Sequence, residues 1–436
     1  MQTKLFFLII FLSIMSCSSK EELNLNNYIP INKNTLNLNF LIDEDKNNSY
    51  LSEVLEIKNI FNAESYKTLN SMIKLPPQKI WEIDTNQKID DENPSLPKPI
   101  FIESNVYILN NEGYLFKING ETGKTIWKKI IFSNLENTII GTPALSGKLN
   151  KDGDVVLYLH NGSDELVAFN ANNESRLWSL KSPLPFRGGI TVTNDFLFVS
   201  DFEGNFFAFN ADNGKIVWST FLGSDSNSIY TAARPILVDK KIVVPGTGGS
   251  FFIISLDNGE ILWTENISSN KELPKLFHTG DIVANPINDD SNIYLVSQSG
   301  ITAAFNINTS EELWSVPVGG FETPSLSGES IFIVGNSGSL VAIDKKTGYV
   351  RWKKDFPRYI NENSYFKDKE LILYKGPTLV DSRLLVSTQD GEVKIFDANN
   401  GNETGVIKVG KLATSPMPVE KKLYFLTVNG KLIAYK

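Results

Sequence analysis

Along most of the chain, short runs of apolar residues alternate with turn-forming residues. The stretch GNFFAFNADNGKIVWST, from Gly204 to Thr220, shows the pattern. Side chains of a β-strand point alternately to opposite faces, so NFFAFN presents apolar residues on both faces. A strand of this kind is covered on both sides. ADNG then supplies a turn, and KIVW is predicted to return as an antiparallel strand.

This stretch is one copy of a repeat whose first and last positions lie fourteen residues apart. The opening positions are Gly113, Asp164, Gly204, Gly249, Gly300, Gly338 and Gly391, and the closing positions are Trp127, Trp178, Trp218, Trp263, Trp314, Trp352 and Gly405. Two half-units remain. Trp81 closes a unit that has no opening, and Gly430 opens a unit that has no close. One repeat therefore accounts for every tryptophan of the chain.

A second pair of strands is predicted upstream of each module, as in residues 234–245, 285–296 and 323–334. Each unit then supplies four strands in about 45 residues, which is typical of a β-propeller blade. Seven whole modules and two complementary halves predict an all-β fold of eight four-stranded antiparallel blades. The ring should close by pairing of Gly430–Lys436 with Lys79–Thr85. A linear solenoid is the alternative, but it does not need complementary half-units at its ends.

Propeller geometry predicts where the bulky and small residues lie. Because blades diverge outward, the outermost strand needs the largest side chain, which explains the tryptophans. The crowded inner strands take small residues or proline, at Pro143, Pro235, Pro286, Pro324 and Pro377. Gly405 leaves the seventh module without its tryptophan, so we expect loose packing at that part of the rim.

The first residues indicate export. Lys4 precedes the apolar run Leu5–Leu12, which is shorter than the roughly 20 residues that span a bilayer. Ile14–Cys17 resembles a bacterial lipobox, in which the cysteine receives a lipid. We therefore predict a signal peptide at 1–16, a lipidated and partly disordered tether at 17–76 and the propeller at 77–436. An incidental thiol behind an ordinary signal peptide is the alternative for Cys17.

Composition narrows the possible partners and chemistry. The net charge of −8 and the scattered basic residues disfavour nucleic-acid binding. The two histidines, His160 and His278, lie in different units without neighbouring ligands, so no metal site is expected and both are interpreted as structural. The glycine-rich run 246–249 leads into a strand rather than a helix and is interpreted as a hairpin turn.

The repeat, with the pattern GxLxAxDxxTGxxxW, resembles that of the pyrroloquinoline-quinone (PQQ) enzyme-like propellers. The resemblance covers Trp81–Lys436. One branch of this superfamily is the quinoprotein dehydrogenases, which hold PQQ and calcium beside a pair of neighbouring cysteines. This chain has a single cysteine. A PQQ-dependent enzyme is therefore kept as the alternative, and no cofactor is expected.

The lipobox, the lone cysteine and the blade number resemble the BamB family of outer-membrane lipoproteins instead. That resemblance implies a monomeric, non-catalytic scaffold that is lipid-anchored at the outer membrane and faces the periplasm. It would bind the POTRA domains of BamA in the β-barrel assembly machinery. A propeller lipoprotein with an unrelated periplasmic partner is a further alternative.

The segment after Trp178 is similar to the Leu-x-Leu-Arg-Gly loop through which the family docks on BamA. By position, Leu184 and Phe186 would be apolar anchors and Arg187 the charged anchor, with Gly188 as a further partner-binding residue. The alternative is structural: the apolar side chains tuck under the sheet and the arginine caps a blade carbonyl. The family's acidic residues before the next blade are missing from Ser228–Arg234.

Overall fold

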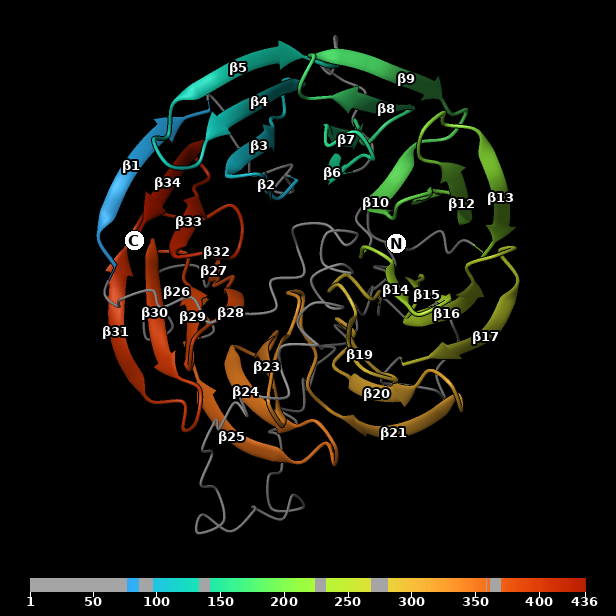
Figure 1. Ribbon diagram of the computed structural model, residues 1–436. Coiled ribbons are helices and arrows are strands. Elements are labelled where there is room, and N and C mark those ends of the chain that lie inside the picture. Colours follow the sequence, from blue (N-terminus) through green and yellow to red (C-terminus); the bar gives the residue numbers. More distant parts are fainter. Residues whose placement is uncertain are drawn as a thin grey trace, which may run out of the picture.

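The chain forms a closed ring of β-sheets. The structure, a computed structural model, describes residues 77–85, 97–132, 142–223, 233–267, 281–357, 359–360 and 370–436. Within these residues, eight four-stranded antiparallel sheets radiate as blades from a central axis (Figure 1). The predicted eight-bladed propeller is therefore confirmed. Cys17, the proposed signal peptide and tether, and His278 lie outside the described residues.

The blades follow one another along the chain, and each runs from the innermost to the outermost strand. Blade one contains β2 (Ile100–Ile102), β3 (Asn105–Leu109), β4 (Tyr114–Asn119) and β5 (Thr125–Ile130). Blade two contains β6 (Ala144–Leu149), β7 (Val155–His160), β8 (Glu165–Asn170) and β9 (Ser175–Lys181). Blade three contains β10 (Phe186–Val192), β11 (Phe196–Asp201), β12 (Asn205–Asn210) and β13 (Ile216–Phe221). Blade four contains β14 (Ile236–Val238), β15 (Lys241–Pro245), β16 (Ser250–Ser255) and β17 (Ile261–Asn266).

The other blades repeat this order. Blade five contains β18 (Ile287–Asp289), β19 (Asn292–Val296), β20 (Thr302–Asn306) and β21 (Glu311–Val316). Blade six contains β22 (Ser325–Ser327), β23 (Ser330–Gly335), β24 (Ser339–Asp344) and β25 (Val350–Asp355), and a short pair, β26 (Tyr359–Ile360) and β27 (Glu370–Leu371), follows it. Blade seven contains β28 (Lys375–Val380), β29 (Arg383–Ser387), β30 (Glu392–Asp397) and β31 (Glu403–Lys408).

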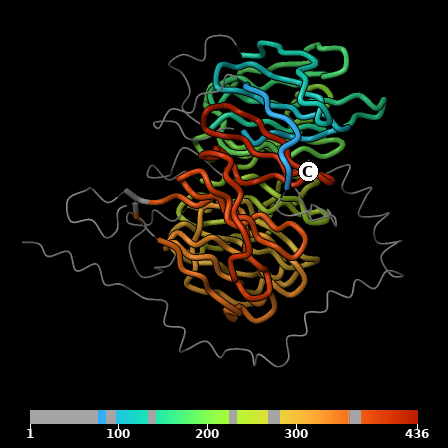
Figure 2. The backbone as a smooth tube through the Cα atoms, turned by 90° about the vertical axis from the view of Figure 1, so that its left-hand side faces the viewer, coloured from blue at the N-terminus to red at the C-terminus, as the bar shows by residue number. Residues whose placement is uncertain are grey.

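Blade eight closes the ring, because its strands come from both ends of the propeller. β32 (Met417–Val419), β33 (Lys422–Leu426) and β34 (Lys431–Tyr435) are joined on the outside by β1 (Lys79–Asp84). Trp81 lies opposite Ala434 in this antiparallel pair, as predicted. Figure 2 shows blue β1 lying against the red C-terminal strands. No turn connects β34 to β1, because the two strands come from opposite ends of the propeller.

The core lies between blades rather than within a single layer. All six residues of β7 and all six of β24 are buried, as expected for strands covered on both faces. Tyr107 of blade one and Leu157 of blade two belong to the same apolar cluster. Each fully buried side chain of this size contributes about 1.5–3 kcal/mol, so stability is spread around the ring.

Each tryptophan lies on an outermost strand and is directed at the next blade. Trp178 Nε1 donates to Ala211 O at 3.0 Å, and Trp218 Nε1 donates to Leu256 O at 3.1 Å. Trp81, Trp314 and Trp352 make the equivalent bond. The indole ring also covers a turn glycine: a Cβ at Gly259, where φ is +75°, would lie 2.5 Å from the ring of Trp218. The repeat thus fastens consecutive blades at the rim.

A β-bulge next to each tryptophan sets the direction of its side chain. In blade three the register shifts between Ala208 and Phe209, which leaves Val217 as the extra residue beside Trp218. Blades one to seven all have this shift at the same place. In blades one, two, three, five and six an aromatic residue on the second strand packs near the indole, as for Tyr294 and Trp314 with ring centroids 6.0 Å apart.

The inner strands are joined by hydroxyl groups that donate to proline carbonyls of the following blade. Thr191 Oγ1 donates to Pro235 O, and Thr378 Oγ1 donates to Pro416 O at 2.9 Å. Ser325 Oγ donates to Pro377 O in the same manner. Proline suits this position because it has no N–H to satisfy at the start of the strand.

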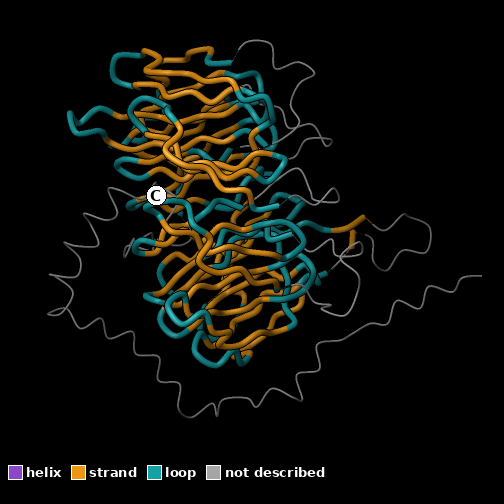
Figure 3. Tube along the Cα trace, turned by 90° about the vertical axis from the view of Figure 1, so that its right-hand side faces the viewer, coloured by secondary structure: helices purple, strands orange, loops and turns teal. Residues whose placement is uncertain are grey.

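The described chain consists of strands and loops (Figure 3). No helix within it has the length and apolarity needed to cross a membrane. At Gly405 an added Cβ would meet only Ile395 Cδ1, at 3.6 Å, so a side chain could start here without a clash.

Candidate protein-docking site

The predicted docking segment comprises the end of the connection after β9 and the first residues of β10, where the chain passes from blade two to blade three. Phe186 N–H donates to Ser163 O at 2.7 Å, and Phe202 N–H donates to Pro185 O at 3.0 Å. These bonds fix the segment between two hairpin turns. Leu184 is half-buried, so part of its side chain reaches the surface.

Phe186 is part of the core. It is the first residue of β10 and only 1% exposed. Its ring lies 5.8 Å from that of His160 at the end of β7. His160 Nε2 is 2.8 Å from Gly188 O, and Gly162 N–H donates to His160 Nδ1 at 3.1 Å. The imidazole is therefore neutral, with its proton on Nε2, and it joins blades two and three.

Arg187 is held in a buried ion pair. Its side chain is 7% exposed, and its Nη2 lies 3.4 Å from Asp281 Oδ2. Asp281 precedes blade five, and its Oδ1 accepts from Gly248 N–H of blade four at 2.7 Å. Burial lowers the pKa of the Arg187 guanidinium, while the Asp281 carboxylate opposes that shift. The pair thus connects blade three, blade four and the segment that leads into blade five.

These positions correct one part of the sequence interpretation. Phe186 and Arg187 were expected on an inter-blade loop as anchors for a partner, yet both lie in β10 and are buried. Gly188 is also buried, with a φ of +78° that favours glycine. Of the four predicted residues, Leu184 alone is partly accessible. The physical reason is that Asp281, far away in the sequence, supplies the countercharge.

The accessible surface at this site consists of residues that the repeat pattern did not single out. Pro183 and Glu203 are exposed, and Phe202 is half-buried beside the guanidinium of Arg187, 6.0 Å from its ring centroid. Together with Leu184 they form a small apolar and acidic surface, which we call the blade-three lip. β11 ends at Asp201, so Phe202 lies in the tight turn that follows. An apolar residue in such a turn is the sequence signal that could have indicated this surface.

His160 makes stability at this junction depend on pH. Burial lowers its pKa from 6.5 to about 4, so the folded protein holds this imidazole neutral. Its contribution is complete above pH 6.5 and is lost as the pH falls towards about 4, because only the unfolded chain binds the proton. The free energy of unfolding should drop by about 3 kcal/mol over this window.

Urea titrations at several pH values check this expectation, with His160→Gln as the control. The glutamine amide can donate to Gly188 O but does not titrate. The difference in unfolding free energy between wild type and variant should therefore shrink on acidification. A difference that stays constant from pH 7 to pH 4.5 would contradict the assignment.

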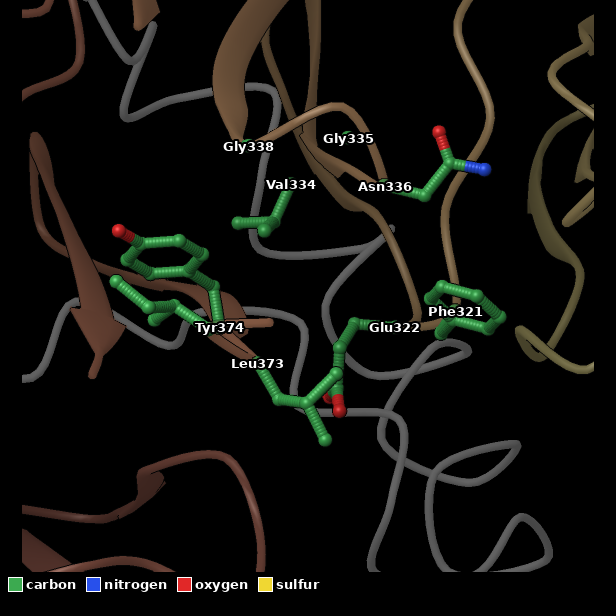
Figure 4. Close-up of a pocket in the computed structure, with 9 residues that line it drawn as sticks. Phe321, Glu322, Val334, Gly335, Asn336, Gly338, Leu373 and Tyr374 are labelled. Atoms are coloured by element: carbon green, nitrogen blue, oxygen red, sulfur yellow. The ribbon is translucent and has the colours of Figure 1, made fainter. Parts of the chain in front are cut away.

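Two of the clefts in the described part of the propeller are small. The first, of about 40 Å³, lies between Phe321, Glu322 and the segment that carries Leu373 and Tyr374 (Figure 4). Glu322 accepts from Ser415 Oγ at 2.6 Å and lies 3.8 Å from Lys375 Nζ. The second, of about 80 Å³, is lined by residues of blades one and eight. Pockets for organic cofactors measure about 300–1,000 Å³, so neither cleft is of that size.

Ligating side chains are also scattered. Among the residues that the structure describes, no three His, Cys, Asp or Glu side chains lie close enough to hold a metal ion. Some buried charged groups connect blades, as Arg187 and Asp281 do, whereas Asp201 and Asp344 hold turns within one blade.

Comparisons with known proteins agree with this fold. Residues 78–354 match the family model of outer membrane protein assembly factor BamB. The BamB of Moranella endobia (strain PCIT) is 22% identical over 356 residues, which cover 77% of this chain and 91% of that protein. The crystal structure of BamB from Moraxella catarrhalis aligns with a TM-score of 0.66 at 17% identity, covering 83% and 99% of the two chains.

The architecture is also shared with enzymes. A europium-containing methanol dehydrogenase aligns with a TM-score of 0.64 at 12% identity, covering 86% of this chain and 91% of the other. Likeness at such identity concerns the fold and not the activity. The family assignment rests instead on the sequence match over most of the propeller: the chain belongs to the family of outer membrane protein assembly factor BamB.

Proposed function

We propose that this protein is a non-catalytic scaffold of the β-barrel assembly machinery. Its lipidated Cys17 would anchor it to the outer membrane, facing the periplasm. There it would bind the POTRA domains of BamA and aid the insertion of outer-membrane proteins. The family match over residues 78–354 carries the proposal. The buried pair of Arg187 and Asp281, which connects blades, supports a rigid scaffold.

The contact with the partner is proposed at the blade-three lip. A rigid ring presents Pro183, Leu184 and Phe202 on short, hydrogen-bonded segments, which lowers the entropy lost on binding. Glu203 adds an exposed charge that can select a basic partner surface. Phe186, Arg187 and Gly188 would support the lip from below.

A pull-down of the tagged protein from its own membranes in mild detergent tests the proposal. Leu184→Ala is compared with Leu222→Ala, because both leucines are half-buried in connections that follow an outermost strand. We expect the wild type and Leu222→Ala to recover a POTRA-containing protein and Leu184→Ala to recover much less. Recovery by all three would retain the scaffold function and move the contact. Recovery by none would refute the function.

The lipid anchor is tested separately with Cys17→Ser. Wild-type protein should incorporate labelled fatty acid and sediment with outer-membrane vesicles, whereas Cys17→Ser should do neither. Label in the variant would place the lipid on another residue. Addition of PQQ and calcium to the purified protein checks the enzymatic alternative, since a bound quinone would be visible in the absorbance spectrum.

A further inference from the structure

The outer edge of blade three differs from the other edges of the ring. β13 has the sequence IVWSTF and carries no charged residue, whereas β1, β5, β9, β17, β21, β25 and β31 each carry at least one. Natural edge strands are usually protected by charged side chains, which prevent another chain from pairing with them. β13 lacks this protection.

β13 carries three exposed apolar side chains. Phe221 is 65% exposed, Ile216 58% and Val217 48%. On the next outer strand, Ile261 and Leu262 are 38% and 49% exposed. β13 and β17 follow one another along the outside of the ring (Figure 1), so these residues belong to one stretch of rim. Exposed apolar residues grouped in this way mark interaction sites.

The backbone of β13 also offers open hydrogen-bonding groups. Leu222 N–H donates to Gly204 O at 2.8 Å, towards the inner strand β12. Because the direction of N–H and C=O alternates along a strand, those of Ser219 and Phe221 point away from β12. β13 is the last strand of its sheet. Two residues therefore present donors and acceptors beside exposed apolar side chains.

We propose that the edge of β13 binds an uncharged, extended segment of another polypeptide whose side chains alternate between apolar and polar. This segment would add to blade three as a fifth strand. Backbone bonds to Ser219 and Phe221 would supply affinity, and apolar side chains would pack on Phe221 and the neighbouring rim. The inference names a substrate class for the scaffold and to that extent rests on the proposed function.

A foreign segment fits this edge better than a second copy of the chain. In an antiparallel pair of two β13 strands centred on Ser219, Phe221 of one copy would face Val217 of the other. Val217 is the extra residue of the bulge, so the pairing would be distorted at both ends. A straight segment can instead pair with Ser219 and Phe221 alone.

The test uses the purified protein and a short fluorescent peptide that alternates valine or tyrosine with threonine. Ser219→Pro removes an outward-facing N–H and no bond to β12, and proline is tolerated at such edge positions. Ser179→Pro is the matched control, because Ser179 occupies the equivalent place on β9, whose edge carries Arg176 and Lys181. Phe221→Lys adds the missing charge to β13.

By fluorescence anisotropy, wild type and Ser179→Pro should bind the peptide equally, and Ser219→Pro and Phe221→Lys should bind at least about tenfold more weakly. Equal binding by all four proteins, equal loss in both proline variants, or no binding by the wild type would overturn the proposal. Self-association that Ser219→Pro abolishes, without peptide binding, would show that the occupant is a second copy.

The same variants separate this inference from the proposed function. Ser219→Pro should still recover the POTRA-containing protein in the pull-down, because the blade-three lip is intact. Peptide binding at β13 without any such recovery would keep the edge site and refute the scaffold function. Recovery of the partner without peptide binding would keep the scaffold function and refute the edge site.

Discussion

Arg187→Ala should lower the free energy of unfolding by about 3–5 kcal/mol, since it leaves the carboxylate of Asp281 buried without its countercharge. Asp281 is 3% exposed and already accepts from Gly248 N–H, so it cannot turn towards water without breaking a contact between blades. The lower free energy of unfolding should appear as a lower urea midpoint, while the circular dichroism spectrum without urea stays that of the wild type.

Two controls define the cause of this effect. Lys181→Ala removes an exposed ion pair with Asp164 and should cost less than about 1 kcal/mol. The double variant Arg187→Leu/Asp281→Leu should recover much of the stability lost by Arg187→Ala, because no charge remains buried. If Arg187→Ala were as mild as Lys181→Ala, the buried pair would not be structural and a partner-binding role for Arg187 would regain support.

Variants of the docking segment differ in what a loss of partner binding would mean. The resemblance to the family loop suggested Phe186 and Arg187 as residues to mutate. Both contribute to blade contacts, so their loss would weaken partner binding through the fold as well as through any interface. Leu184, which is half-buried and outside β10, gives a result that can be interpreted.

The fold could be predicted from the sequence because its signals are local. Strand alternation, a turn and a tryptophan recur within one module, and complementary half-units indicate closure of the ring. The role of Arg187 could not be predicted, because Asp281 is 94 positions away and no pattern connects them. The repeat pattern also does not predict the aromatic residue of the second strand, such as Tyr294, because connections of variable length separate that strand from the repeat.

Trp218→Ala should be comparably damaging, at about 3–5 kcal/mol, because it removes a large buried side chain at the rim. Trp218 is 9% exposed and contacts Gly259 and the carbonyl of Leu256 in blade four. Gly259→Val should act from the opposite side of the same contact, since its φ is positive and its Cβ would overlap the indole. Urea midpoints of the two variants and their combination measure this, and the combined loss should be less than additive.

Gly405 is the informative exception to this contact. In the other blades that form the tryptophan bond, the acceptor lies where the third strand turns towards the fourth. Blade eight has no such turn, because β34 and β1 come from opposite ends of the propeller. A tryptophan at position 405 would therefore lack both the acceptor and the glycine that its ring covers. Gly405→Trp should leave the urea midpoint unchanged or lower it, although a Cβ at this position meets no atom closer than Ile395 Cδ1 at 3.6 Å. An increase similar in size to the loss in Trp218→Ala would show that filling space at the rim, rather than the contact with the turn, is what the tryptophans contribute.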